Sequence, residues 1–453
     1  MSFMGGGDFS GGGDKSLKMS LADTVRLAWA DPDLRSRLKF VFFIFAVYAL
    51  GIHIQVPIPG VDPAQLERLL QSNQFLNLVN AMGGGGLRKI SIFALALNPY
   101  ITASIIMQVL QSAFPAFKQE MKEGGEYARK QMNKRTRMLA LLLCGFQGWG
   151  LLQLIKQTGS IPASSQTVPM FLMVIAFWTA GSMFLLWLGE QVSERGIGNG
   201  VSILIFAGII ISFPYYAGQV AFGVQTGTTS IFQVVLVMLM FALMTWFVVL
   251  FTIAQRRIPI QHMRRQMGTK ALGGQTSYLP FSLNMVGVIP IIFAVSLVYM
   301  PQQFASMIPV GAPMHNFFEG LAKFTTPNLH TWTGVAGVFF YMALIFFFTY
   351  FYTAIQFNVE DIADNLKRGG SFIPGIRPGK QTKDFLDSVI SRITFIGALF
   401  LSIVSVNQYL VPLLINIQQI QLIFGTSLLI MVSVALETMR QIEANLLMKQ
   451  YGQ

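Results

Sequence analysis

Long apolar stretches recur along the whole chain, and this feature constrains the fold more than any other. Most of them approach the roughly 20 residues that a helix needs to cross a bilayer. A helix is also the natural spanning element, because it satisfies its own backbone polar groups in hydrocarbon. The composition agrees, since 53% of the residues are hydrophobic and 11% are charged. The chain is therefore predicted to be an all-α membrane protein with ten transmembrane helices, at 38–56, 92–114, 136–155, 168–188, 201–216, 231–253, 281–299, 333–352, 385–411 and 422–436.

The lysines and arginines between these stretches fall on alternate sides of the membrane. Most lie in the loops before the first span and after the second, sixth and eighth spans. Loops rich in Lys and Arg stay in the cytoplasm, so both ends of the chain are predicted to be cytoplasmic. The formal net charge of +12 therefore sits on one membrane face, unlike the charge of a nucleic-acid-binding protein. The opposite loops carry only Arg68, Arg88, Lys89, Lys156 and Lys323.

The spans divide into two halves of five, at 34–225 and 226–453, after a Gly-rich tail at 1–33 that is expected to be disordered. An odd number of spans per half requires that the halves are inverted relative to each other, with the working site between them. The second span of each half contains an internal proline, Pro99 or Pro290, which is expected to kink or break that helix. Proline is common in membrane helices, but interrupted helices at matching positions favour a central path.

The spans hold almost no ionisable side chains, and Arg392 and Glu437 lie near span ends. Ion-driven carriers usually place acids or histidines within the bilayer, so a secondary transporter of small solutes is the weaker interpretation. An intramembrane enzyme is also disfavoured, because the four histidines do not cluster and no catalytic, metal-binding or nucleotide-binding motif occurs. Cys144 is the single cysteine and is expected to be a small buried apolar residue. We predict a passive conduit without cofactors.

Two long cytoplasmic loops, at 254–280 and 357–384, are candidates for docking cytosolic partners. The first has five basic residues and no acid, which is more charge than topology needs. The second contains the sequence GIRPG, a tight turn that presents Arg377 rigidly and suits bidentate contact with phosphate or carboxylate. The simpler alternative is topogenic charge or contact with lipid headgroups. The candidate docking residues are Arg256, Arg257, Arg264, Arg265 and Arg377.

Several strings resemble those of the SecY family, the central subunits of bacterial Sec protein-translocation channels. The resemblance extends from about residue 34 to residue 451. It implies two halves arranged as a clamshell around an hourglass pore in the bacterial cytoplasmic membrane. The strings that carry it are VPIPG at 56–60, SIFALALNPYITASII at 91–106, LGEQVSERGIGNGVSILIFAGI at 188–209, QRRIPI at 255–260, LPFSLNMVGVIPIIFA at 279–294, ADNLKRGGSFIPGIRPGKQT at 363–382 and GTSLLIMV at 425–432.

The resemblance also implies a pore ring and a lateral gate. Bulky apolar side chains close the waist of the pore, and a narrow apolar constriction can dewet. Without the resemblance, each of these residues would be read as ordinary packing between membrane helices. The implied pore ring is Leu97, Ile101, Val201, Ile205, Ile292 and Ile430. The gate lies between the second and seventh spans, and its implied residues are Asn98, Pro99, Met107 and Pro290.

A plug segment at 75–89 is expected to seal the outer funnel, by the same resemblance. Its apolar part is too short to span a membrane. Consecutive glycines disfavour helix by about 1 kcal/mol each relative to alanine, so the glycine run is interpreted as a hinge. An ordinary flexible outer loop is the alternative. The implied plug residues are Phe75, Leu76, Leu78, Val79, Met82, Gly83, Gly84, Gly85 and Gly86.

The function that the resemblance implies is a non-enzymatic protein-conducting channel. It would translocate unfolded secretory polypeptides across the membrane and release membrane helices sideways through the lateral gate. The implied partners are the small subunits SecE and SecG, the motor ATPase SecA, the ribosome, signal peptides, nascent chains and membrane lipids, with no small-molecule substrate. The chain has no nucleotide motif, so the motor or the ribosome would supply the energy.

Overall fold

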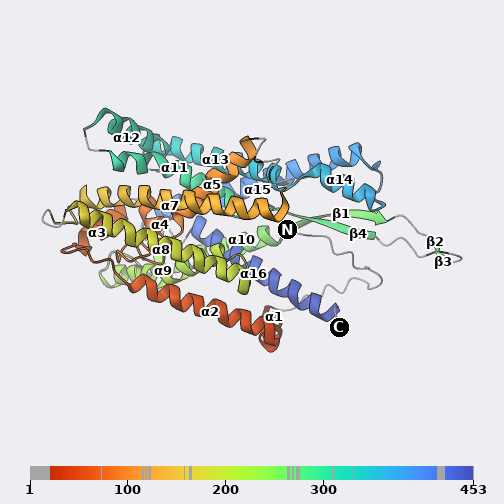
Figure 1. Cartoon of the computed structure of the whole chain (residues 1–453), viewed down its shortest axis with the longest axis horizontal. Helices are drawn as coiled ribbons and strands as arrows, with labels where there is room; N and C mark the ends of the chain where they lie inside the picture. The colour runs from red at the N-terminus through yellow and green to blue at the C-terminus, as the bar shows by residue number, and fades with distance from the viewer. Residues whose placement is uncertain are drawn as a thin grey trace.

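The computed structural model is mainly helical. It describes residues 21–72, 74–114, 117, 120, 124–157, 159–162, 166–262, 266–267, 270–271, 276–308, 311–329, 331–415 and 424–451. Long helices run side by side along the longest axis of the molecule (Figure 1). Each of the ten predicted spans overlaps one of them: α2 (Pro32–His53), α5 (Asn98–Ala113), α7 (Gly125–Gln157), α8 (Val168–Arg195), α9 (Gly200–Gln225), α10 (Ile231–Ile253), α11 (Ile289–Met307), α13 (Trp332–Gln356), α15 (Lys380–Ile415) and α16 (Thr426–Tyr451).

Not every one of these helices is long and apolar enough to cross a membrane alone. Within the described residues, seven helices meet both requirements. The apolar part of α11 is shorter, and α5 has only 16 residues. Helices of this kind span a bilayer only together with the segments beside them, because a full crossing needs about 20 residues. The hydropathy pattern therefore located the spans but not the ends of the helices.

Pro99 and Pro290 break the helices of their predicted spans, which is one of the two outcomes expected from the sequence. Both prolines lie in the first turn of their helices, since α5 begins at Asn98 and α11 begins at Ile289. Proline suits the first turn of a helix, where its missing N–H would have no intrahelical partner. The apolar residues before each helix form turns and bends instead, and Ala96 there has a positive φ of 49°. The two prolines still occupy matching positions in the two halves.

The predicted N-terminal tail is shorter than expected, because α1 (Leu21–Ala30) is helical. Residues 1–20 lie outside the described residues. Asp31 follows α1 and caps α2 through its side chain, and Lys449 near the end of α16 donates to both Asp31 carboxylate oxygens at 2.9 Å. This hydrogen bond holds the pKa of Asp31 below its ordinary value. Beside it, Ala28 of α1 is buried in one cluster with Leu446 of α16.

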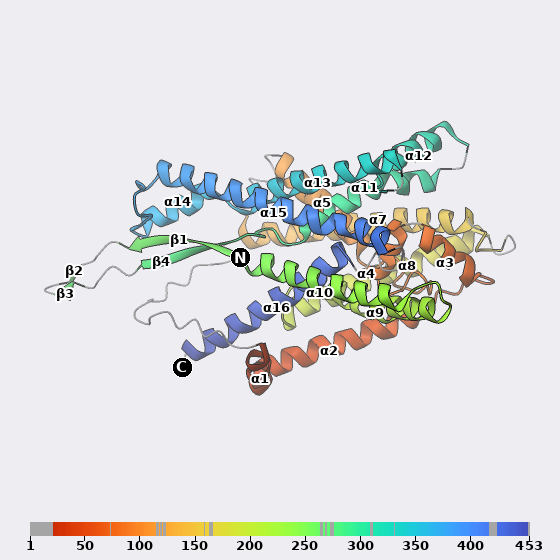
Figure 2. The same cartoon turned by 180° about the vertical axis from the view of Figure 1, so that it is seen from behind.

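The two predicted docking loops join in one small sheet. Strand β1 (Gln255–His262) pairs antiparallel with β4 (Thr276–Ser282) and, at its far end, with β5 (Ser371–Phe372) from the second loop. Helix α14 (Val359–Arg368) lies beside it, and a common apolar cluster joins sheet and helices. Short strands β2 (Gln266–Met267) and β3 (Lys270–Ala271) extend the hairpin. Figure 2 shows this assembly at one end of the molecule, whereas α3 (Pro63–Ser72) and α12 (Pro313–Thr325) lie at the other.

Helices α8 and α9 approach each other through glycine. A Cβ atom on Gly200 would overlap the carbonyl oxygen of Gly189, so the backbone of α9 contacts α8 directly. Gly218 lies on the same helix with no heavy atom within 4 Å of its ideal Cβ position. The first glycine is therefore needed for packing, whereas the second is not.

Gly200→Ala should lower the thermal stability of the purified protein in detergent. Alanine favours helix over glycine by about 1 kcal/mol, but the overlap with Gly189 should cost about 1–3 kcal/mol through overpacking. Gly218→Ala is the matched control, and it should leave the unfolding temperature unchanged or raise it. Equal unfolding temperatures for the two variants would contradict the close approach of α8 and α9.

Candidate functional site

The structure brings the six residues of the pore ring into one apolar cluster. Leu97, Ile101, Ile205 and Ile430 are buried there, with 3–7% of their surfaces exposed. Val201 and Ile292 are partly buried and pack against the same cluster. The cluster combines helices α5 and α9 of the N-terminal half with α11 and α16 of the C-terminal half. The predicted ring residues thus meet at the boundary between the two halves.

All six residues lie at or near the starts of their helices. Leu97 is the N-cap of α5, and Ile101 follows it by four residues, which places both on one face. Val201 and Ile205 repeat this spacing in the first turns of α9. The positive ends of the helix dipoles therefore converge on the cluster, which disfavours cations there. The side chains themselves add no charge, because every member of the cluster is apolar or aromatic.

Asn98 lies beside the ring but bonds away from it. Its Nδ2 donates to Oε1 of Gln147 on α7 at 3.4 Å, and Gln147 Nε2 donates to Oγ1 of Thr102 at 3.4 Å. The polar group that adjoins Leu97 is therefore held by α7 rather than left among the apolar side chains. Sequence reasoning missed Gln147 and Thr102. The spacing of four residues between Asn98 and Thr102 was the one available signal.

The two helices assigned to the lateral gate touch along a short stretch only. A hydrogen bond also joins the two halves close to these helices, from the Tyr352 hydroxyl of α13 to Oε1 of Gln108 on α5 at 2.8 Å. Met107 is buried beside it. A cavity of about 1080 Å³ opens there, lined by residues of α5, α13, α14 and α15, Gln108 among them. The boundary between the two halves at α5 therefore has few contacts, and it borders a cavity.

The plug segment contains a short helix followed by turns. Helix α4 (Gln74–Met82) ends where the glycine run begins. Gly84 and Gly85 have positive φ values of 68° and 84°, which glycine adopts without strain. The run also packs tightly, since a Cβ on Gly86 would approach Ser91 Oγ to 2.7 Å. The glycines therefore end the helix and let the chain turn within a crowded space.

The last carbonyl groups of α4 are bound by neighbouring helices. Ser212 of α9 donates from Oγ to the Ala81 carbonyl at 3.0 Å, and Tyr48 of α2 donates to the Met82 carbonyl at 3.4 Å. A Cβ on Gly208 of α9 would overlap that same Met82 oxygen. Since the final carbonyls of a helix lack intrahelical partners, these contacts seat α4 against α9.

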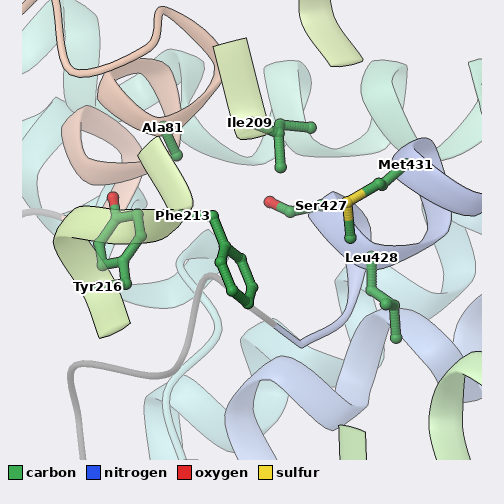
Figure 3. A pocket seen from close by; sticks show the side chains of 7 residues that line it. All are labelled: Ala81, Ile209, Phe213, Tyr216, Ser427, Leu428 and Met431. Atoms are coloured by element: carbon green, nitrogen blue, oxygen red, sulfur yellow. The ribbon is translucent and has the colours of Figure 1, made fainter. Parts of the chain in front are cut away.

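A small cavity lies between the plug helix and the boundary of the two halves. Its volume is about 10 Å³, close to the minimum for a single water. Figure 3 shows Ala81 of α4 facing this space together with side chains of α9 and α16. Ile209 is one of the α9 residues, and Ser427 is one of the α16 residues. The plug helix therefore lies close to both α9 and α16 at this point.

The candidate docking arginines are exposed where the structure describes them. Arg256 and Arg257 lie on β1, and Arg377 lies in the loop after β5. Gly375 and Gly379 flank Arg377 with φ values of 82° and 103°. The Arg377 carbonyl accepts a hydrogen bond from Thr382 Oγ1 at 2.9 Å, which fixes the turn. None of the three arginines forms an ion pair with a described residue. The other two candidates, Arg264 and Arg265, lie outside the described residues.

The fold and this site define a class of protein: a polytopic helical membrane protein whose two halves meet at an apolar constriction with a plug segment against it. The profile of the SecY family matches residues 91–439, and the chain belongs to that family. Protein translocase subunit SecY of Staphylococcus aureus is 37% identical over 425 residues, which cover 92% of this chain and 96% of that protein. SecY of Aquifex aeolicus is 38% identical over 427 residues, with the same coverage.

Solved structures show the same fold. The structure of a protein-conducting channel superposes with a TM-score of 0.66 at 19% identity, covering 94% of this chain and 97% of that one. A structure concerned with the SecY plug domain, which stabilises the closed state of that channel, gives a TM-score of 0.64 at 18% identity with the same coverage. Such structures have ten helices in two halves, which agrees with the fold class expected from the sequence.

Gly208→Ala should displace α4 from its seat on α9. The overlap with the Met82 oxygen should cost about 1–3 kcal/mol, enough to raise the population of displaced plug about tenfold. The measurement is the rate at which a membrane-impermeant thiol reagent labels Leu78→Cys, a buried plug position, on a Cys144→Ala background. Gly218→Ala on the same helix is the control and should leave the rate unchanged. No faster labelling with Gly208→Ala would mean that α4 does not depend on this close contact.

Proposed function

We propose that this chain is the channel subunit through which unfolded secretory polypeptides cross the cytoplasmic membrane. The observation that carries the proposal is the apolar cluster that joins the six pore-ring residues from both halves. Membership in the SecY family supports the same function. In this view the ring closes the resting pore, the plug segment reinforces it from the outer side, and both yield when a polypeptide enters.

The chemistry of the ring explains how one site can pass a chain and still block ions. An ion that enters an apolar constriction loses hydration, with no protein group to replace it. A constriction of this kind also excludes water. Branched side chains such as Ile101 and Ile205 can close again around a moving polypeptide, because no ion pair or metal fixes their positions. The seal therefore needs packing alone, and packing adapts to the substrate.

Sideways release of membrane helices would occur between α5 and α11. The short contact between these helices and the proline at the start of each support this assignment. Polar contacts such as Tyr352 to Gln108 would have to break when a signal sequence separates the halves. A hydrophobic segment that reached lipid here would gain about 25 cal/mol for each Å² of apolar surface removed from water.

A secondary transporter of small solutes is the alternative from another class. Such carriers usually hold ionisable side chains within the membrane. Among the described residues, the buried polar side chains are Ser, Thr, Asn and Gln, with no acid, base or histidine. The exposed arginines of the two cytoplasmic loops have no evident role in such a carrier. Both observations favour the channel.

We place both ends of the chain in the cytoplasm, with the β1–β4 hairpin facing cytosolic partners. Arg256, Arg257 and Arg377 are proposed to dock SecA or the ribosome, and a related Sec61 channel was solved in a ribosome–channel complex. SecE and SecG are proposed as the small membrane subunits. The rigid turn around Arg377 supports docking, because an ordinary loop does not need such stiffness.

The central test replaces Ile101, Ile205 and Ile292 together by serine. Hydroxyl groups should wet the constriction, so the resting ion conductance in planar bilayers should rise while preprotein transport with SecA and ATP continues. The control places serine at Val109, Ile210 and Ile289, which are exposed positions on the same three helices. If neither triple variant raises the resting ion conductance, the pore lies elsewhere.

Arg377→Glu should block SecA-driven transport into proteoliposomes without changing resting conductance. Loss of an arginine that anchors an interface costs about 2 kcal/mol or more, or roughly thirtyfold in affinity. Arg129→Glu makes the same charge change at an exposed position of α7 on the same membrane face, and it should transport far better. Normal SecA affinity and transport by Arg377→Glu would overturn the docking assignment.

A further inference from the structure

The two flanks of the plug helix converge on one side chain, Tyr215 of α9. Glu67 lies on α3, before α4, and Arg88 lies after the glycine run. Tyr215 directly follows Pro214, the proline inside α9. None of these residues takes part in the pore ring, the lateral gate or the docking loops. Their arrangement is therefore not explained by the function proposed above.

Tyr215 contacts one flank of the plug helix with its hydroxyl and the other flank with its aromatic ring. Its hydroxyl donates a hydrogen bond to Oε1 of Glu67. Gln219, one helical turn later, donates from Nε2 to the same Glu67 oxygen at 3.1 Å and to the Tyr215 hydroxyl. The guanidinium carbon of Arg88 lies 3.4 Å from the centroid of the Tyr215 ring, a cation–π contact. One tyrosine thus binds an anion with its hydroxyl and a cation with its ring.

The helix between these flanks is tied to the same site. Asn80 of α4 is buried, and its Oδ1 accepts the backbone N–H of Arg88 at 2.9 Å. Tyr216 donates from its hydroxyl to Oδ1 of Asn77 at 3.2 Å. Together with Glu67 and Tyr215, these residues line a polar cavity of about 30 Å³. The consecutive tyrosines of α9 therefore contact the plug helix at Asn77 and the chain on both sides of it.

We propose that Glu67, Arg88, Tyr215 and Gln219 are positioning residues that clamp the plug segment in its resting place. This clamp rests on the proposed function, since it matters only if the segment seals a pore. Hydrogen bonds to a carboxylate are stronger than neutral ones, and partial burial strengthens them further. Breaking the clamp separates the opposite charges of Glu67 and Arg88 from their shared partner. The plug then leaves its seat more readily.

The test measures resting open probability in planar bilayers without substrate. Tyr215→Phe removes the hydroxyl but keeps the ring under Arg88, and Glu67→Gln removes the charge while keeping the shape. Each variant loses part of a hydrogen bond to a charged group, so the resting open probability should rise about tenfold. Because both changes weaken the same bond, the double variant should leak about as much as either single variant. Tyr215→Leu also removes the cation–π contact and should leak most.

Two controls separate the possible results. Phe222→Leu alters an exposed aromatic residue on the same helix and should stay silent. Deletion of 75–83 should leak whether or not the clamp exists, because it removes the plug helix itself. If the Tyr215 variants do not raise the resting open probability but the deletion does, the clamp is wrong and the proposed function still stands. A silent deletion would instead overturn the role of the plug. Leakage without change in the unfolding temperature would show that the effect is on plug position rather than on folding.

Discussion

The two halves of the chain are joined at one apolar cluster, where helix starts from both halves meet. The six predicted ring residues in this cluster are all apolar. Its cohesion is packing, and packing between branched side chains is lost and regained without breaking a strong directional bond. A barrier made in this way can open for a polypeptide and still exclude hydrated ions. Each of these helix starts contributes at least one of the six predicted ring residues to the cluster.

The plug segment uses a different kind of contact. Its helix is seated by carbonyl groups that accept from Ser212 and Tyr48, and its flanks reach the hydroxyl and ring of Tyr215. These contacts are polar, directional and few, so they define one position instead of a range of positions. In the proposed channel, the apolar ring would adapt to its substrate, whereas the plug segment would have one resting place. The glycine run after Met82 joins the two, since it gives the chain a tight turn beside the ring.

Much of the fold was predictable because the membrane imposes a simple rule on every span. Hydropathy located all ten helices, and the family strings identified the ring residues that the structure brings together. The ends of α5 and α11 were not predictable from hydropathy. An apolar residue is compatible with a helix or with a buried turn, so the residues before Pro99 and Pro290 looked like a continuous span. Helix α1 was missed because a ten-residue amphipathic segment is stable only when it packs against another element.

The sequence by itself determined which segments enter the membrane, which face carries the basic loops and which side chains are apolar enough to form a seal. These properties belong to single segments, so each follows from the local sequence of its own segment. Only the tertiary structure decided which distant groups become partners. Glu67 and Tyr215 are 148 residues apart, and Asn98 and Gln147 are 49 residues apart. The two predicted docking loops join through β1 and β5 in the same way. A polar side chain does not reveal its partner in advance, because the packing of whole helices decides which groups are brought within hydrogen-bonding distance.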